Sequence, residues 1–183
     1  KGLLNCIHFW QEHYPQIAVL GIHETQESAD DIYITQVNGI RIAILNYTYG
    51  TNGIALPKDM PYAVDLWNEN NIRRDMELAR QEADFIVVCP HWGTEYKLQE
   101  TADQQAKAQF LADLGADLII GTHPHVIEPV KWITGESGNE TLVYYSLGNF
   151  INATSGTGAG TAARMVGAMA QVTVTIDDTD AYI

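Results

Sequence analysis

The sequence has 183 residues, 46% hydrophobic and 18% charged, which fits one globular domain and argues against intrinsic disorder. Asp and Glu number 23 against 10 Lys and Arg, and the resulting net charge of −13 argues against a nucleic-acid partner, because phosphate binding needs a positive surface. No apolar run approaches the roughly 18 residues that a membrane-spanning helix needs, so no membrane span is expected in this chain.

The first part of the chain predicts a helix, a short strand and a β-hairpin, over residues 1–14, 18–22 and 32–46. Apolar residues at helical spacing define the helix, and Pro15 stops it. Asn38-Gly39 lies between two strand-like runs, and this dipeptide is a strong signal for a two-residue hairpin turn.

The rest of the chain alternates helical and strand-like segments. The expected elements are a loop over 50–61, a helix over 63–82, strands over 84–89 and 117–120 around a helix over 101–114, a hairpin of 130–133 and 142–146, and a closing strand over 165–176. The two strands around the 101–114 helix are joined by a connection of crossover length, so they are expected to be parallel neighbours. Residues 152–163 are rich in Gly, Ala and Thr and are expected to be mobile. Without a repeat or linker, residues 1–183 are expected to form one α/β domain.

Two segments rich in potential metal ligands follow these two parallel strands. The first is Pro90–Tyr96, which contains His91, and the second is Gly121–His125. Sites in open α/β sheets form outside the carboxyl ends of strands, and the crossover brings both loops to one edge. We therefore expect His91, His123 and His125 to converge.

Local spacing supports this convergence. Pro124 disfavours the helical region for His123, so His-Pro-His is expected to be extended, with both imidazoles on one face. His91 and Glu95 are four residues apart, which is same-face spacing, and Gly93 between them leaves space for a ligand to approach the backbone.

Neutral imidazole is the commonest transition-metal ligand, and carboxylates complete many hydrolytic sites. A single histidine in such a loop is more often an ordinary polar or core residue, but three at one strand edge favour metal binding. The remaining histidines, His8, His13 and His23, do not cluster and are interpreted as surface residues. Cys89 ends an apolar strand and is expected to be a buried thiol.

A third segment, Tyr144–Phe150, also follows a strand. Its Gly148-Asn149 pair fits an ordinary turn as well as it fits a role for Asn149 or Tyr145 in lining the site. The sequence has neither a nucleotide-binding P-loop nor a Gly-x-Ser-x-Gly elbow, which argues against the usual nucleotide-binding and serine-hydrolase sites.

Four segments together resemble the bacterial capsule synthesis protein family, CapA, also called the poly-γ-glutamate capsule biosynthesis family. They are VNGIRIAIL (37–45), HWGTEY (91–96), GADLIIGTHPHVIEP (115–129) and YSLGNF (145–150). They occur in the family's order and spacing, and the resemblance extends from Lys1 to about Ile176.

The resemblance implies the calcineurin-like metallophosphoesterase fold, a β-sandwich of two sheets covered by helices. It also implies two divalent metals in the intact protein, such as Mn, Zn, Fe or Mg. His91, His123 and His125 would be metal ligands, and His125 or Glu95 would transfer protons as the catalytic groups. Four further residues would line the site: Trp92, Gly93, Tyr145 and Asn149.

The fold's first metal-binding motifs, a bridging Asp and an Asn-His pair, have no counterpart in this sequence. Lys1-Gly2 resembles the residues that follow that Asn-His pair, and Asp84 and Asp117 begin strands, at the ends opposite to the histidines. The chain is therefore expected to be a piece of a longer domain, with the N-terminal part of the fold absent and half of the site present.

The leading functional hypothesis is a metal-dependent hydrolase or transferase, in which activated water attacks a phosphoester or an amide-like bond. The resemblance places this activity in the biosynthesis of a poly-γ-glutamate or polysaccharide capsule, with the anionic polymer and other capsule proteins as partners. It also implies an extracytoplasmic protein, anchored to the membrane through an N-terminal segment outside this chain. The alternative is a non-catalytic component that binds the polymer or organises the capsule machinery.

For the chain by itself, we expect at most one divalent metal, bound at the three histidines, and no phosphoesterase turnover. Metal binding is expected to fail as the pH falls through the imidazole pKa of about 6.5. Polyanion binding is expected to be weak and to improve with salt or divalent cations, because an acidic surface repels a polyanion unless metals or the few basic residues, such as Lys97, Lys131 and Arg164, face it.

Overall fold

The structure is a computed structural model that describes residues 2–152, 160–177 and 180–183. Its helices are α1 (Gly2–His13), α2 (Gln26–Asp30), α3 (Glu69–Glu82), α4 (Ala102–Asp113) and α5 (Thr161–Met165). Its strands are β1 (Tyr33–Val37), β2 (Ile40–Thr48), β3 (Phe85–His91), β4 (Leu118–Ile120), β5 (Val130–Thr134), β6 (Glu140–Tyr144), β7 (Thr175–Ile176) and β8 (Ala181–Tyr182). None of the described helices is long and apolar enough to cross a membrane.

Six strands form one mixed sheet in the order β1-β2-β3-β4-β6-β5. The four inner strands are parallel, and β1 and β5 pair antiparallel at the two edges. The predicted α/β class is confirmed, as is the parallel pairing of the two strands around α4.

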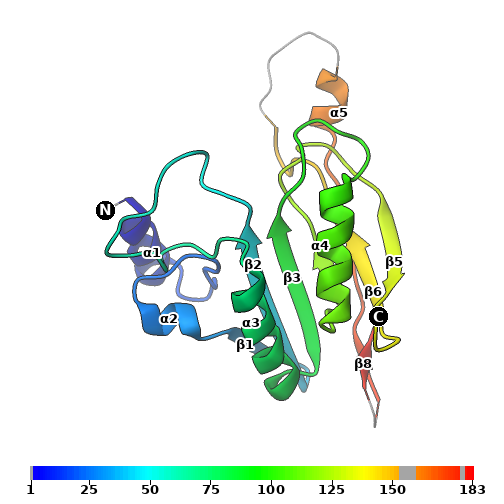
Figure 1. Ribbon diagram of the computed structural model, residues 1–183, viewed down its shortest axis with the longest axis horizontal. Coiled ribbons are helices and arrows are strands. Elements are labelled where there is room, and N and C mark those ends of the chain that lie inside the picture. Colours follow the sequence, from blue (N-terminus) through cyan, green and yellow to red (C-terminus); the bar gives the residue numbers. More distant parts are fainter. Residues whose placement is uncertain (1, 153–159, 178–179) are drawn as a thin grey trace.

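Both long helices cover the same face of this sheet (Figure 1). The chain steps from β2 through α3 to β3 and through α4 to β4, and two right-handed crossovers in the same direction place both helices on one side. Their apolar side chains pack on alternate residues of the strands, and Ile72, Met76 and Leu111 are completely buried there. This core supports the loops at the carboxyl ends of β3 and β4.

The opposite face is covered by the C-terminal segment, which Figure 1 shows behind the sheet. Ala181 of β8 packs with Phe85, Leu118 and Leu142, so this ribbon of β7 and β8 forms the second layer among the described residues. The prediction that residues 165–176 close the large sheet is wrong. β1 and β5 are the edge strands of that sheet, and the C-terminal segment packs on its face instead of pairing with either of them.

Two other boundaries differ from the sequence expectations. The strand expected over 18–22 does not form, and only Ile22 makes an isolated bridge, to Val64. The helix expected over 63–82 begins at Glu69, because the Asn68 side chain accepts hydrogen bonds from the next helical N–H groups and caps it. Before that cap, Val64 and Leu66 form isolated bridges with Ile22 and Thr48, a pairing that apolar periodicity does not distinguish from a helix.

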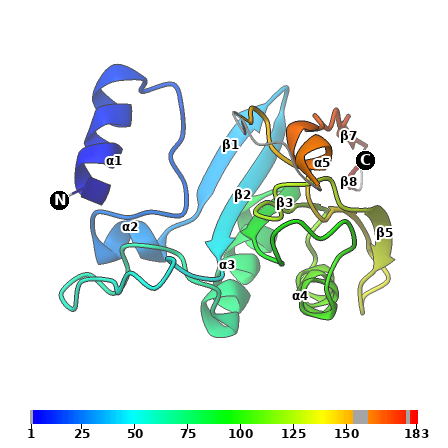
Figure 2. The same cartoon turned by 90° about the horizontal axis from the view of Figure 1, so that it is seen from above.

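The other local expectations agree with the structure where it describes them. Asn38 and Gly39 have φ values of 52° and 91°, as a two-residue hairpin turn requires, and the hairpin of β5 and β6 forms. The first helix ends at His13. Of the segment expected to be mobile, residues 153–159 lie outside the described residues, and 161–165 form α5 (Figure 2).

The histidines outside the candidate site behave differently from one another. His8 and His13 are exposed, as expected. His23 is not a surface residue, because its side chain is 13% exposed and its Nε2 lies 2.8 Å from Asp65 Oδ2. Cys89 is largely buried, and burial raises the pKa of its thiol to about 11.

Candidate metal centre

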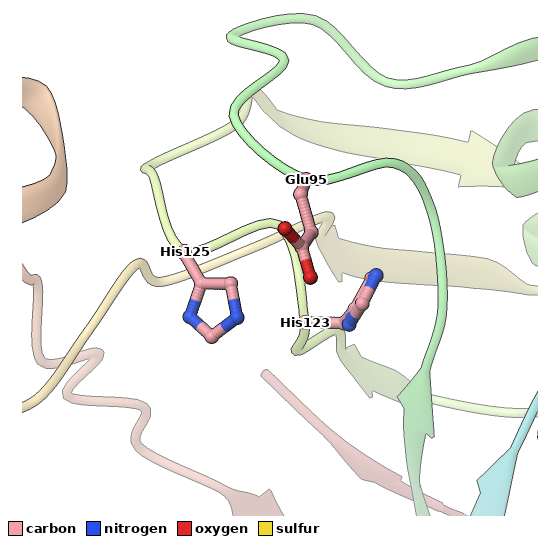
Figure 3. Close-up of side chains that lie close together, drawn as sticks. All are labelled: Glu95, His123 and His125. Atoms are coloured by element: carbon pink, nitrogen blue, oxygen red, sulfur yellow. The ribbon is translucent and has the colours of Figure 1, made fainter. Parts of the chain in front are cut away.

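A histidine- and carboxylate-rich cluster lies at the carboxyl ends of β3 and β4. Glu95 comes from the loop after β3, and His123 and His125 come from the loop after β4. One potential ligand atom of each residue lies within 4.8 Å of those of the other two. Figure 3 shows the Glu95 carboxylate between the two imidazole rings. The crossover topology thus brings two distant segments to one point in space.

The His-Pro-His backbone is not extended, so that expectation is wrong. His123 has a φ of 101° and His125 a φ of 60°, values that residues with a Cβ rarely adopt. Pro124 is buried, and it excludes the right-handed helical region for His123 without excluding positive φ. The two imidazoles still lie near each other, with ring centroids 5.9 Å apart. Strained backbone of this kind is concentrated at functional sites.

Asn149 orients the His125 ring. Its Oδ1 lies 2.8 Å from His125 Nδ1, and its Nδ2 donates to the His125 and Arg164 carbonyls at 3.1 and 3.0 Å. Because the amide hydrogens are used by the carbonyls, Oδ1 is the acceptor and Nδ1 carries the proton. The lone pair of His125 Nε2 is therefore available for a metal.

His91 lies beside this cluster at the exposed end of β3. Its ring centroid is 4.7 Å from that of His123, and its Nδ1 is 3.2 Å from Thr122 Oγ1. The Thr122 hydroxyl donates to the Pro90 carbonyl, so its oxygen can accept from His91 Nδ1 and leave Nε2 as a lone pair. The structure therefore brings all three predicted histidines together, with Glu95 rather than His91 in the tightest group.

Tyr49 is a site residue that the sequence reasoning missed. Its ring stacks on His91 with centroids 5.9 Å apart and an interplanar angle of 8°, and it lies 5.0 Å from the ring of His123. Its position just after β2 could have indicated this role. Because β2 is parallel to β3, the carboxyl ends of both strands lie at the same edge of the sheet.

Partial burial lowers the pKa of both His91 and His123. For His91, desolvation is the main cause and the neighbouring imidazoles add to it; for His123, desolvation again dominates, while Glu95 opposes it. These influences favour neutral imidazoles, which is the form that binds a metal.

Three of the expected lining residues have other roles. Trp92 and Tyr145 are only 1% and 2% exposed, and their stacked rings belong to the core below the site. Gly93 does not leave space for a ligand, because a Cβ there would lie 2.6 Å from the Gln104 side chain. Its φ of 86° also favours glycine.

A buried polar link below the loops was also missed from sequence. Gln104 Nε2 donates to Glu128 Oε2 at 2.6 Å, while Gln104 Oε1 accepts from the Thr101 N-cap of α4. Glu128 is 2% exposed, and burial raises the pKa of its carboxyl. The acidic residue in the apolar run Val126–Pro129 was the signal. This link joins α4 to the loop that carries His125.

The donor set fits a divalent transition metal. Two imidazoles whose Nδ1 or Nε2 atoms face a carboxylate, with a third imidazole adjacent, match the ligands of zinc and related ions. At least one of these imidazoles is oriented by a hydrogen bond to its other nitrogen, as metal-ligating histidines normally are.

Comparisons with known proteins give a consistent family. The profile of a family described as "Bacterial capsule synthesis protein PGA_cap" matches residues 1–154. "PGA biosynthesis protein CapA" of Bacillus subtilis (strain 168) is 37% identical over 130 residues, which cover 70% of this chain and 33% of that protein. "Capsule biosynthesis protein CapA" of Bacillus anthracis is 30% identical over 156 residues, covering 82% and 36%. The chain thus spans about a third of the length of these relatives.

The solved structures that this chain resembles in part include two from Thermus thermophilus. A hypothetical protein has a TM-score of 0.44 and 20% identity, covering 67% of this chain and 41% of that one. A 5′-nucleotidase precursor has a TM-score of 0.43 and 21% identity, covering 61% and 23%.

Proposed function

This chain belongs to the bacterial capsule synthesis protein family, and we propose that the protein is a metal-dependent hydrolase or transferase of capsule biosynthesis. The observation that carries the proposal is the convergence of Glu95, His123 and His125, with potential ligand atoms within 4.8 Å of one another. The positive-φ backbone of His123 and His125 and the hydrogen bond from His125 to Asn149 support the same interpretation, because both features prepare side chains for a ligand.

His91, His123 and His125 are the proposed nitrogen ligands. When bound, a divalent metal supplies Lewis acidity and lowers the pKa of its water. An imidazole that binds the metal through its lone pair cannot accept a proton, so Glu95 rather than His125 is the proposed proton acceptor during attack. Glu95 is exposed and accepts no hydrogen bond from the described residues, which leaves its carboxylate free for this role.

The proposed substrate is an anionic capsular polymer or its precursor, with a phosphoester or an amide-like bond at the reacting centre. The name of the Bacillus subtilis relative, a PGA biosynthesis protein, favours poly-γ-glutamate over a polysaccharide. Family membership also supports work at the cell envelope with other capsule proteins, and we propose an extracytoplasmic location. Residues 1–183 are proposed to be one part of a longer metallophosphoesterase-like domain that holds two metals.

Calorimetric titration with Zn²⁺ or Mn²⁺ tests the metal centre. The native chain is expected to bind one ion, Glu95→Gln to retain most of the affinity, and the double variant His123→Ala/His125→Ala to bind none. Two tight sites in this chain, or binding that survives the double substitution, would show that the centre is elsewhere.

Hydrolysis of γ-linked glutamate oligomers by the longer protein tests the enzymatic part. Turnover that requires the metal and is lost in Glu95→Gln supports the proposal. Metal binding without turnover, together with retained polymer binding, supports the alternative of a non-catalytic polymer-binding component.

A further inference from the structure

Arg164 on α5 lies beside the candidate metal centre. Its Cζ is 5.1 Å from the centroid of the Tyr96 ring, and that ring is 5.9 Å from the ring of His125. Figure 1 shows α5 beyond the carboxyl ends of the central strands, on the side where the metal loops emerge. Two ring contacts therefore connect the guanidinium to a proposed metal ligand.

The backbone of Arg164 is attached to the same site. Its carbonyl accepts hydrogen bonds from Asn149 Nδ2 at 3.0 Å and from Asn152 Nδ2 at 2.7 Å. Asn149 is the residue that orients His125, so one amide side chain holds both the proposed ligand and the segment with the arginine. A side-chain substitution at Arg164 leaves these backbone bonds in place.

Among the described residues Arg164 has no carboxylate partner, and its guanidinium donates one hydrogen bond, from Nη2 to Thr161 Oγ1 at 3.3 Å. Several other Lys and Arg residues form ion pairs with nearby carboxylates in the described ranges, as in Arg41–Asp84, Arg74–Asp75 and Lys131–Glu100. Arg164 makes no such pair there, although the chain has 23 acidic residues. An arginine that stays unpaired in a protein of net charge −13 has its charge available for a ligand.

The position of the Arg164 guanidinium over the Tyr96 ring suits recognition of a carboxylate. A guanidinium lying on an aromatic ring is held in one plane, and its N–H groups point outward along the plane edge. That planar fork matches a carboxylate in a two-point hydrogen-bonded pair. The stacking on Tyr96 also reduces the side-chain entropy that binding would otherwise cost.

We propose that Arg164, held against Tyr96, binds a free carboxylate of the capsular polymer and positions the neighbouring bond at the metal centre. This inference rests on the proposed function. A γ-linked glutamate polymer carries one free carboxylate per residue beside its backbone amide, so a carboxylate contact next to the centre sets which bond is presented. Arg164 is thus a specificity residue, and it offsets locally the repulsion of a polyanion by an acidic protein.

The test is calorimetric binding of a γ-linked glutamate pentamer to the Mn²⁺-loaded protein, with the pentamer's carboxamide form as the uncharged probe. Arg164→Gln is expected to weaken pentamer binding on the order of 10- to 100-fold, the range for a lost charge-assisted hydrogen-bonded pair. The pentamer affinity of Arg164→Lys is expected to lie between those of the native protein and Arg164→Gln, because lysine keeps the charge and loses the two-point hydrogen-bonding geometry of the guanidinium. The carboxamide form is expected to bind weakly to the native protein and equally to Arg164→Gln.

Arg73→Gln is the matched control. Arg73 also lies over an aromatic ring, with its Cζ 4.6 Å from the Phe110 centroid, but it belongs to α3, away from the centre. This variant is expected to bind the pentamer like the native protein. Inorganic phosphate is included as a competitor, and strong displacement of the pentamer by phosphate would assign the arginine to phosphate and overturn the carboxylate proposal.

Metal titrations of each variant separate this inference from the proposed function. If the native protein fails to bind metal, the proposed function fails, while pentamer binding with and without Arg164 can still be compared. Three results would each overturn the role of Arg164. They are an unchanged pentamer affinity in Arg164→Gln, no pentamer binding by the native protein, and binding of the carboxamide form to the native protein as tight as that of the pentamer.

Discussion

The two ends of β3 and β4 carry similar polar residue types and use them differently. At the amino ends, Asp84 accepts hydrogen bonds from the Arg41 backbone and guanidinium, and Asp117 accepts one from the Ile86 N–H at 2.7 Å. At the carboxyl ends, Glu95 accepts none from the described residues. A carboxylate at a strand end is therefore structural where protein donors occupy its lone pairs and available for chemistry where they do not.

Backbone conformation separates the two ends in the same way. The connections at the amino ends have positive φ at Asn38, Gly39 and Gly115, residue types that adopt it readily, whereas the loops at the carboxyl ends have it at His123, His125 and Tyr96. Strain of this kind costs on the order of 1–3 kcal/mol per residue. The amino ends thus stabilise the fold, and the carboxyl ends are stabilised by it.

The largest expected effect is the loss of metal binding in His123→Ala/His125→Ala. Removing two of three nitrogen ligands is expected to reduce affinity by about 1000-fold or more, while the free energy of unfolding changes by less than about 1 kcal/mol, because loop-edge side chains carry little of the core. Zn²⁺ titration and urea unfolding measure both. A large loss of stability would contradict the separation of the two ends.

The next effect is at the amino end, where Asp117→Asn should change the pH dependence of stability. Burial raises the pKa of Asp117 to about 6, and the neighbouring Asp180 adds to the rise. The folded protein then holds a proton that the unfolded chain releases near pH 4, so this carboxyl stabilises the fold at low pH and the benefit is lost as the pH rises through about 6.

The stabilisation that protonated Asp117 loses as the pH rises corresponds to about 3 kcal/mol in the free energy of unfolding, from a shift of about two pKa units. Urea unfolding at pH 4, 5, 6 and 7 is expected to show this decline in the native protein relative to Asp117→Asn, with metal affinity unchanged. Parallel pH profiles for the two proteins would contradict the assignment.

An intermediate effect is expected for Asn149→Ala, which removes the acceptor for His125 Nδ1. Loss of such an orienting partner typically weakens metal binding by about 10- to 100-fold. Titration with Zn²⁺ measures the change, and Asn152→Ala is the control, because Asn152 donates to the same Arg164 carbonyl without contacting His125. Equal losses in the two variants would indicate displacement of α5 rather than loss of ring orientation.

The smallest effect is a gain in stability. Glycine adopts positive φ freely, so His123→Gly is expected to raise the free energy of unfolding by about 1 kcal/mol while weakening metal binding. His23→Gly is the control, because His23 has no positive φ and pairs with Asp65, and it is expected to lower stability. Destabilisation by His123→Gly would show that the histidine side chain contributes more to packing than its strain costs.

Much of the fold was predictable because its signals are local. Asn38-Gly39 specifies a hairpin turn through its own backbone preferences, and the length of the segment around α4 admits only a crossover. The fate of residues 165–176 was not predictable. Alternating hydrophobicity indicates that a segment contacts a sheet, but it does not indicate whether the segment pairs at an edge or packs on the face. The same limit applies to residues 63–68, where bridges to other strands replace a helix.

By itself, the sequence determined that two ligand-bearing loops meet at one edge, because parallel strands joined by a crossover must end on the same side. Only the tertiary structure decided how the side chains are arranged there. Gly93 faces Gln104 rather than open space, and Glu95 joins His123 and His125 in the tightest group. These outcomes depend on packing between loops and helices that are distant in sequence, which local residue preferences do not encode.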